Sequence, residues 1–445
     1  MPLPRPQGRT VGPGVLHDGF VLMDLRNRIG LYGSYFLGMA GIGFTLPYLP
    51  LYLGQEGLSD RAIGIISTLA AVAGLAQFPV GLWSDRLGWR KPFLVVALAA
   101  VAASTWFLRE AHGVVWIGLL VVLFAENGIG RAVVESLAGA EAAALAPEGK
   151  VGSALGALRL WKPIGIVLMT LFGSWMAETR GGVASILVPL FVVQCLAVAA
   201  SLLIHESGAR DKPKGDSPGG EAVDLRPASP RGGWLPKDAG LWSFAAAMVL
   251  YHAANAPGGV YLGLFLKRDL QAADRMLAYA FTVSMVAWMI VVWPAGWLAD
   301  RWGRKPLLVV GWTIMTVRLA LVAVIRSPTM IVANQALDGL GNGIFAVLAA
   351  AWVTDRLADP RRTGEAQVIV GSCLVLGSAI GPAAAGSLVG SLGYRGLFWA
   401  LAGVGALATA VVVALVPETL TTPGGRREAG AINPMATTSD LSTSP

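Results

Sequence analysis

The stretch Gly81-Leu-Trp-Ser-Asp85-Arg86-Leu-Gly88-Trp-Arg90-Lys91-Pro92 interrupts a long apolar region, and Gly296-Trp-Leu-Ala-Asp300-Arg301-Trp-Gly303-Arg304-Lys305-Pro306 repeats it almost unchanged. The two aspartates are 215 residues apart, close to half the length of the chain. Asn127-Gly128-Ile129 and Asn342-Gly343-Ile344 repeat with the same period. Self-similarity at one long period predicts a chain that is built from two similar halves.

The composition excludes a soluble globular protein. Of the 445 residues 55% are hydrophobic and 14% are charged, and the mean hydropathy is +0.61. Soluble domains carry about 25% charged residues. Several apolar runs exceed the roughly 18 residues that cross a bilayer as a helix, and the alternating segments of a membrane β-barrel are missing from the sequence. We therefore expect an all-α integral membrane protein.

Twelve apolar segments, six in each half, are predicted to be transmembrane helices. They cover residues 29–53, 63–83, 93–108, 114–134, 155–175, 184–204, 241–266, 276–298, 307–325, 330–353, 366–392 and 397–416. The predicted domains are an N-terminal arm (1–28), a six-helix bundle (29–204), a central loop (205–238), a second six-helix bundle (239–416) and a tail (417–445). The central loop and the tail are rich in small and polar residues, which predicts a flexible loop and a disordered tail.

The distribution of Lys and Arg predicts the orientation. With twelve spans, 22 basic residues of the arm, loops and tail fall on one side of the membrane and eight on the other. The positive-inside rule then places both termini in the cytoplasm, and we expect the protein in the plasma (inner) membrane. The net charge of +7 raises the alternative of nucleic-acid binding. Because the basic residues lie in loops between spans, lipid headgroups and topology explain them better.

Charged residues inside the spans of the first half are candidate functional groups, because a charge at bilayer depth costs about 2.5–3.5 kcal/mol. Glu126 and Arg131 lie in the fourth span, and Arg159 and Lys162 lie in the fifth. Glu126 and Lys162 are expected at similar depth, so they are a plausible ion pair. Arg131 can also pair with Glu135, four residues along the helix. A structural salt bridge is the competing interpretation. If a proton is carried, Glu126 is the favoured site in this half.

In the second half the candidates are His252, Asn255, Asp338 and Asn342. His252 titrates near neutral pH, but a lone histidine is more often a hydrogen-bonded core residue. Asp338 ranks above His252, because a carboxylate near the middle of the membrane is harder to explain structurally. Arg318 in the ninth span is expected to pair with Asp338 or to extend toward the membrane surface.

The chain resembles the major facilitator superfamily over nearly its whole length. The resemblance rests on the Gly-x-x-x-Asp-Arg-x-Gly-Arg-Lys pattern between the second and third spans, which returns between the eighth and ninth. It implies two six-helix bundles related by pseudo-two-fold symmetry and a cytoplasmic latch. The latch residues are Gly81, Asp85, Arg86, Gly88, Arg90, Lys91, Gly296, Asp300, Arg301, Gly303, Arg304 and Lys305.

Each latch residue has an implied role. Gly81 and Gly296 would allow helices to approach closely. Asp85 and Asp300 would face the start of a helix in the opposite half, where the exposed N–H groups favour a carboxylate, and Arg86 and Arg301 would hold these aspartates. Trp89 separates Gly88 from Arg90 in the first copy and departs from the family pattern. The competing interpretation is that these charges only fix the topology.

The resemblance implies a secondary active transporter that moves a small organic solute by alternating access. The stretches Leu46-Pro-Tyr-Leu-Pro-Leu-Tyr52 and Leu158-Arg-Leu-Trp-Lys-Pro163 are similar to uptake symporters for lactose, nucleosides and aromatic acids. Gly377-Ser-Ala-Ile-Gly381-Pro382-Ala-Ala-Ala-Gly386 is similar to the motif of drug:proton antiporters, although that motif normally lies in the fifth span. We favour proton-coupled efflux. The alternatives are proton-coupled uptake of a sugar, nucleoside or aromatic acid, and a receptor that keeps the fold without transporting.

The sequence lacks the motifs of other classes of membrane protein, such as ATP-driven pumps and enzymes. The chain has no phosphate-binding loop of an ATP-driven pump, and its four histidines and two cysteines form no metal-binding or catalytic spacing. We expect no enzyme activity, no metal and no cofactor. The expected partners are the solute, protons and membrane lipid, and the protein is expected to act as a monomer.

Overall fold

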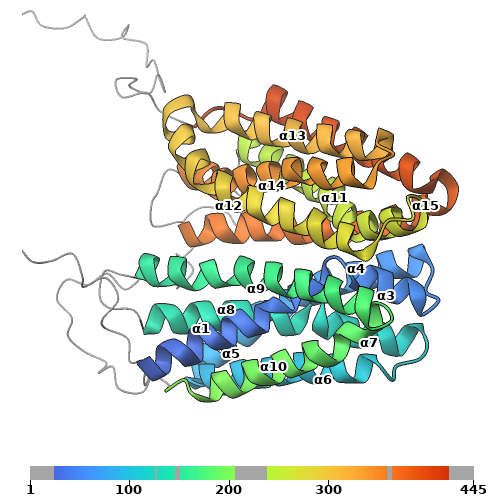
Figure 1. Ribbon diagram of the computed structural model, residues 1–445. Coiled ribbons are helices and arrows are strands. Elements are labelled where there is room, and N and C mark those ends of the chain that lie inside the picture. The colour runs from blue at the N-terminus through green and yellow to red at the C-terminus, as the bar shows by residue number, and fades with distance from the viewer. Residues whose placement is uncertain (1–24, 126–127, 146–150, 206–237, 358–362, 420–445) are drawn as a thin grey trace, which may run out of the picture.

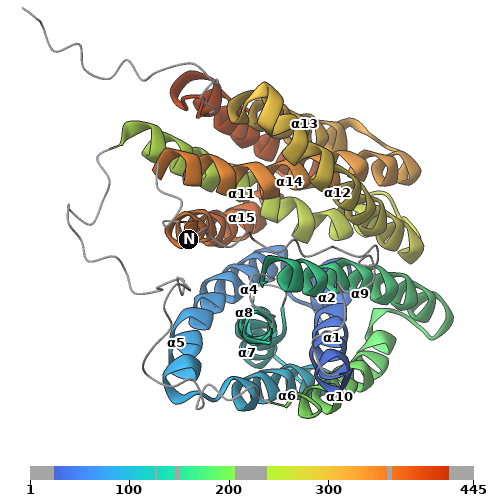
Figure 2. The same ribbon diagram turned by 90° about the vertical axis from the view of Figure 1, so that its left-hand side faces the viewer.

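The computed structural model describes residues 25–125, 128–145, 151–205, 238–357 and 363–419. Two bundles of roughly parallel helices lie side by side (Figure 1). The first bundle contains α1 to α10, and the second contains α11 to α15. Figure 2 views the same molecule along the helices and shows α4 and α9 next to α11, α12 and α15. The predicted central loop and tail lie outside the described residues, apart from short flanking pieces.

The first bundle makes six crossings. Its helices are α1 (Leu25–Ala40), α2 (Ile42–Thr45), α3 (Leu49–Gln55), α4 (Asp60–Ala73), α5 (Gln77–Leu87), α6 (Arg90–Leu108), α7 (Val114–Phe124), α8 (Ile129–Ala144), α9 (Val151–Thr179) and α10 (Leu187–Leu202), with short 3-10 turns at Gly74–Ala76 and Val183–Ile186. Three of the predicted continuous spans are interrupted. The first predicted span (29–53) bends by 49° before α3, where Pro47 and Pro50 remove backbone donors. The second predicted span (63–83) contains the 3-10 turn at Gly74–Ala76, and the fourth (114–134) is divided into α7 and α8.

The second bundle has fewer and longer helices. They are α11 (Ala239–Arg268), α12 (Asp274–Trp302), α13 (Arg304–Val324), α14 (Pro328–Leu357) and α15 (Thr363–Leu415). α15 contains the two predicted spans 366–392 and 397–416, which meet at Gly393. That glycine has a φ of 66° and a ψ of 177°, a non-helical conformation that turns the chain back.

Within the described residues, nine helical stretches, or ten with the bent α1–α3 pair, are long and apolar enough to cross a membrane. One of them, Ile369–Leu415, is 47 residues long and turns at Gly393, so it provides two crossings. α11 has 30 residues, about 45 Å at 1.5 Å per residue, and provides one more. The count agrees with the twelve predicted spans.

The bundles have two ends, the motif end and the Asp60 end. The motif end contains the turns between α5 and α6 and between α12 and α13, where the repeated motif lies. The Asp60 end is the opposite one and contains the start of α4 and the connection from α11 to α12. Helices α4 and α9 of the first half pack against α15 and α12 of the second, and this packing forms the boundary between the halves.

Candidate functional site

The two halves are joined at the Asp60 end. The Asp60 carboxylate of α4 accepts hydrogen bonds from Arg268 of α11 (2.8 Å) and from the hydroxyl of Tyr394 in α15 (3.1 and 3.2 Å). The Arg268 guanidinium also donates to the Tyr394 hydroxyl (2.9 Å), and Tyr261 of α11 donates to the backbone carbonyl of Asp60 (2.9 Å). Three side chains of the second half therefore converge on one residue of the first half.

Close backbone packing also joins the two halves near the Asp60 end. Thr68 of α4 donates to the carbonyl of Ala379 in α15. A Cβ atom added at Gly64 would collide with the carbonyl oxygen of Pro382, and one added at Gly386 would collide with that of Asp60. On the other side of the boundary, the backbone N–H of Arg275 in α12 donates to Glu178 at the end of α9 (3.1 Å). These contacts lie at, or within a few turns of, the Asp60 end.

A polar cluster of the first half lies nearer the motif end. Lys162 of α9 donates to Glu135 of α8 at 2.7 Å, with the two side chains 27% and 42% exposed. Tyr35 of α1 lies 3.5 Å from the same carboxylate. Glu135 is thus a partner of Lys162. From the sequence, Glu135 was expected as a partner of Arg131 only. Glu126, the partner predicted for Lys162, lies outside the described residues, so that pairing stays a prediction.

Arg131 holds the break in the fourth crossing together. It is 2% exposed, and it donates to the carbonyl of Phe124 (2.8 Å), the last residue of α7, and to the carbonyl of Gly38 in α1 (2.6 Å). Both carbonyls lie beside helix breaks, where backbone acceptors lose their intrahelical partners. These two contacts give Arg131 a structural role, and the role predicted for it in proton coupling stays a prediction.

A second polar cluster joins four helices of the second half. Arg318 of α13 is 1% exposed and forms an ion pair with Asp338 of α14. Asp338 also accepts hydrogen bonds from Ser284 of α12 (2.6 Å) and from Asn342 one turn along α14 (2.9 Å). Asn255 of α11 completes the cluster, because its amide group donates to Asn342 (2.7 Å) and accepts from Arg318 (3.1 Å).

The Arg318–Asp338 cluster is only partly buried. The Asp338 side chain is 20% exposed, and Asn255, Asn342 and Ser284 are also of intermediate exposure. Asp338 carries the negative charge that faces the buried guanidinium of Arg318, and loss of this pair would leave a buried cation without its partner. The structure brings the predicted Asn255, Asp338 and Asn342 together, and it shows Arg318 as the partner of Asp338.

His252 lies apart from this cluster, in the packing between α11 and α15. It is 7% exposed and packs edge-on against Phe345, with ring centroids 4.8 Å apart. Among the described residues its Nε2 atom has no hydrogen-bond partner. A Cβ atom added at Gly377 of α15 would come within 2.5 Å of the His252 Cβ atom. His252 is therefore packed as a core residue but, within the described part of the chain, lacks the hydrogen bond expected of a core histidine, and its functional role stays a prediction.

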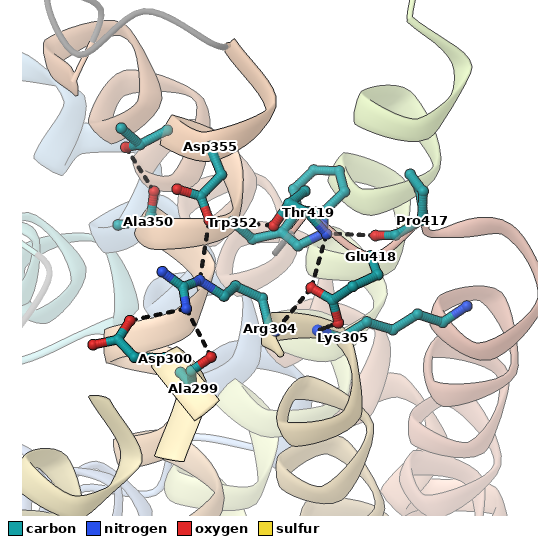
Figure 3. A network of polar contacts seen from close by, with 11 residues as sticks. Ala299, Asp300, Arg304, Lys305, Ala350, Trp352, Asp355, Pro417, Glu418 and Thr419 are labelled. Carbon is teal, nitrogen blue, oxygen red and sulfur yellow. Dashed lines mark hydrogen bonds and ion pairs between the residues drawn. The ribbon is translucent and has the colours of Figure 1, made fainter. Parts of the chain in front are cut away.

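The second copy of the repeated motif forms a compact network at the motif end (Figure 3). Arg304 donates to Asp300 (2.9 Å), to Asp355 of α14 (3.0 Å) and to the carbonyl of Ala299 (2.7 Å). The Glu418 carboxylate accepts the backbone N–H groups of Arg304 and Lys305 (2.9 and 3.0 Å). A carboxylate at these first N–H groups of α13 stabilises the helix start.

Three contacts expected of this motif are not seen among the described residues in this conformation, and the latch roles stay predictions. Asp300 is held by Arg304, whereas Arg301 lies over the ring of Trp297 at 3.9 Å. The described contacts of Asp300 are within its own half, and its side chain is 73% exposed. Cβ atoms added at Gly81 and Gly296 would meet their nearest neighbours at 3.8 and 3.7 Å, which is ordinary contact, so neither glycine is needed for close packing here. The side chain of Asp85 is outside what the structure describes.

Trp89 is an insertion in the turn and leaves the helix start unchanged. Gly88 ends α5 with a φ of 69° and Trp89 precedes α6, whereas Gly303 alone separates α12 from α13. Arg90 and Arg304 are therefore equivalent first residues of their helices. Lys91 donates to the carbonyl of Leu202 at the end of α10 (2.9 Å), and Lys305 donates to that of Val413 near the end of α15 (2.8 Å). The two copies make the same contact despite the extra residue.

The described residues contain no group of three or more His, Cys, Asp or Glu side chains that could hold a metal ion. Sequence reasoning missed Asp60 and its partners. Ser59 and Asp60 give only the signal of a helix start, which Ser59 indeed caps by accepting from the backbone N–H of Ala62 at 3.2 Å. Nothing in the sequence links Asp60 to residues more than 200 positions away.

Comparisons with known proteins agree on one family. Residues 29–400 match the model described as the MFS_1 like family. An uncharacterised MFS-type transporter of Mycobacterium tuberculosis is 26% identical over 412 residues, which cover 90% of this chain and 92% of that protein. The multidrug resistance efflux pump PmrA of Streptococcus pneumoniae is 26% identical over 385 residues, which cover 84% of this chain and 91% of PmrA.

Solved structures show the same fold. The nucleoside transporter NupG matches with a TM-score of 0.72 and 14% identity, over 87% of this chain and 99% of that one. A bacterial homologue of the human lysosomal transporter Spinster, solved in an inward-facing and occupied conformation, matches with a TM-score of 0.69 and 16% identity. The match covers 86% of this chain and 95% of the homologue.

Proposed function

This chain belongs to the MFS_1-like family of secondary transporters, and we propose that it exports a small organic solute in exchange for protons by alternating access. The observation that carries the proposal is the pair of polar clusters inside the bundles, Lys162–Glu135 in one half and Arg318–Asp338 in the other. Groups of this kind are costly at membrane depth and mark solute or proton pathways in membrane proteins.

The conformation supports the alternating-access part of the proposal. The contacts between the halves at Asp60, Thr68 and Glu178 hold the Asp60 end together. At the motif end, Asp300 is exposed and paired within its own half. We place the motif end in the cytoplasm of a plasma-membrane protein, because the positive-inside rule puts the motif loops and both termini there. The conformation is then open to the cytoplasm, as the related Spinster homologue was when solved facing inward.

Asp338 is the proposed proton-binding group. Its carboxylate is partly exposed and holds Arg318, Ser284 and Asn342, so the arrival of a proton would release contacts to α12 and α13. Glu126 remains the candidate of the first half. The latch is proposed to act in the opposite conformation, when the motif ends meet and Asp85 and Asp300 reach helix starts of the other half. The protein is proposed to work as a monomer within membrane lipid.

The direction of transport rests on the relatives. PmrA is named as a multidrug efflux pump and is 26% identical to this chain, whereas the nucleoside transporter NupG is 14% identical. We therefore favour export. Uptake of a nucleoside, sugar or aromatic acid is the second candidate, because the fold also matches that of the nucleoside transporter NupG with a TM-score of 0.72.

A flux assay tests the proposal. The purified protein is reconstituted in liposomes, and the uptake and efflux of a broad solute panel are measured with and without an imposed pH gradient. Gradient-driven movement out of the side that corresponds to the cytoplasm is expected. Movement that is insensitive to the gradient for every solute would contradict proton coupling, and the opposite direction would favour the uptake alternative.

A further inference from the structure

An open groove runs between α13 and the part of α15 that follows Gly393. These two segments pack against each other and lie on the side of the second bundle that faces away from the first bundle (Figures 1 and 2). The groove therefore opens to membrane lipid and is separate from the boundary between the halves. Its lining residues are Thr313, Thr316, Ala406, Thr409, Ala410, Val413 and Ala414.

The floor of the groove is apolar although it contains threonines. The Thr316 hydroxyl donates to the carbonyl of Trp312 (2.9 Å), and the Thr409 hydroxyl donates to the carbonyl of Gly405 (2.9 Å). Each hydroxyl is thus bonded back to its own helix, one turn earlier. A molecule in the groove meets methyl groups and small side chains, which suits a hydrocarbon chain.

The length of the groove matches one leaflet of a membrane. Thr316 lies twelve residues after the start of α13 at Arg304, which is about 18 Å along the helix axis. Ala406 lies nine residues before the end of α15 at Leu415, which is about 14 Å. The hydrocarbon core of a bilayer is about 30 Å thick. The groove therefore extends from the motif end to about the middle of the membrane.

Lys305 lies at the mouth of the groove, at the second position of α13. Its ammonium group donates to the carbonyl of Val413, a lining residue (2.8 Å). Among the described residues it makes no other hydrogen bond and no ion pair. Figure 3 shows that the Lys305 side chain extends away from Asp300 and Asp355, and Glu418 binds backbone N–H groups. Because an ammonium has three donors, Lys305 can also bind an anion at the membrane surface.

We propose that this groove binds one anionic phospholipid, with its phosphate at Lys305 and one acyl chain along the groove. The argument is the unneutralised charge at the mouth together with an apolar floor that is one leaflet long. Basic groups between transmembrane helices bind acidic lipid headgroups in this way. A free phosphate ion would use Lys305 but not the groove. The inference goes beyond the proposed transport and does not depend on it.

Native mass spectrometry of the purified full-length protein in detergent micelles tests the proposal. Phosphatidylglycerol and phosphatidylcholine with the same acyl chains are titrated, and the affinity for the first bound lipid is recorded. Phosphatidylglycerol is expected to bind more tightly, and inorganic phosphate should not displace it. Lys305→Gln should weaken phosphatidylglycerol about fivefold, as expected for the loss of one lysine near a headgroup, and Lys305→Arg should weaken it less.

A second variant tests the groove itself. Ala410→Trp fills the groove and should also weaken phosphatidylglycerol, whereas Leu407→Trp on the same helix lies outside the lining residues and should not. Lys91→Gln is the matched control for Lys305, because Lys91 makes the equivalent contact with the carbonyl of Leu202 in the first half. It should leave the affinity unchanged.

Three results would overturn the proposal. The first is equal affinity for the two lipids, and the second is full affinity in Lys305→Gln or Ala410→Trp. The third is an equal loss in Lys91→Gln, which would mean that the effect is not specific to this groove. A dimer that Ala410→Trp dissociates, with lipid affinity unchanged, would identify a second copy of the chain as the occupant and would also overturn the proposal.

Discussion

Asp60 in the first half and Arg268 in the second form an ion pair of 2.8 Å, although 208 residues separate them along the chain. It is the charged centre of the contacts that hold the Asp60 end together. Removing it should shift the protein toward conformations that are open at this end.

Asp60→Asn tests this contact. Partly exposed ion pairs contribute about 1 kcal/mol or less, so the population open at the Asp60 end should rise by up to roughly fivefold. Spin labels at positions 110 and 271, in loops of the two halves at this end, report the change as a longer distance by electron paramagnetic resonance. Lys267→Gln is the control, because it breaks an ion pair with Asp274 within the second half. Equal distances in Asp60→Asn and the wild-type protein would contradict the account.

Gly64→Ala should act on the same equilibrium through packing. A Cβ atom at Gly64 would collide with the Pro382 carbonyl, whereas one at Gly156 in the same half has nothing within 4 Å. Since backbone cannot yield as a flexible side chain does, Gly64→Ala should force α4 and α15 apart. The same spin-label distance should lengthen in Gly64→Ala and stay unchanged in Gly156→Ala. A shift of equal size in both variants would rule out the proposed role of this contact.

The Lys162–Glu135 pair predicts a non-additive effect on stability. Glu135→Gln or Lys162→Met alone leaves one charge inside the bundle without this partner. Each should lower the free energy of unfolding by roughly 1–2 kcal/mol, less than for a fully buried pair because both side chains are partly exposed. The double variant should be closer to the wild type than either single variant. Denaturant unfolding in micelles measures this coupling, and additive losses would contradict it.

Asp238 predicts a dependence of stability on pH. It caps the start of α11 and accepts two hydrogen bonds from Arg356 of α14 (2.6 and 2.9 Å). This contact with Arg356, followed by bonds from the backbone of Leu241 and Gly240, holds the pKa of Asp238 below its usual value. Because the folded-state pKa is lowered, the stabilisation is present above the unfolded-state pKa of about 3.9 and is lost as the pH falls through the folded-state value.

Asp238→Asn keeps a helix-capping side chain and removes the charge. The variant should unfold at a lower temperature than the wild type at pH 7, and the difference should shrink as the pH falls below about 4. Asp269→Asn at the other end of α11 is the control and should show no such convergence. A temperature difference that stays constant from pH 7 to pH 3 would argue against the Asp238–Arg356 contact.

Sequence patterns predicted the parts of this molecule that depend on one helix at a time. Apolar runs predicted all twelve crossings, and the period of 215 residues between Asp85 and Asp300 predicted two halves. The pairing of Asp338 with Arg318 was one of two expected outcomes. Breaks within the crossings were not predicted, because Gly128 and Pro47 are common in membrane helices and do not by themselves end one.

Contacts between distant helices could not be predicted in the same way. Lys162 could have paired with any carboxylate at its depth, and the sequence offered both Glu126 and Glu135 in one span. The choice depends on how α8 is oriented from its start at Ile129. The contact between Asp60 and Arg268 depends on which end of the bundles is joined, and the proposed alternating access would require the same sequence to encode a second conformation without this contact.

The central claim, that solute movement is coupled to a proton at Asp338, is tested most directly by recording proton movement. A solute found in the flux assay is added to liposomes that contain the protein and an entrapped pH-sensitive dye. We predict a solute-induced pH change with the wild-type protein and none with Asp338→Asn, while solute exchange at equal concentrations on both sides continues in the variant. Solute movement through the wild-type protein without any pH change, or an unchanged pH signal in Asp338→Asn, would contradict the claim.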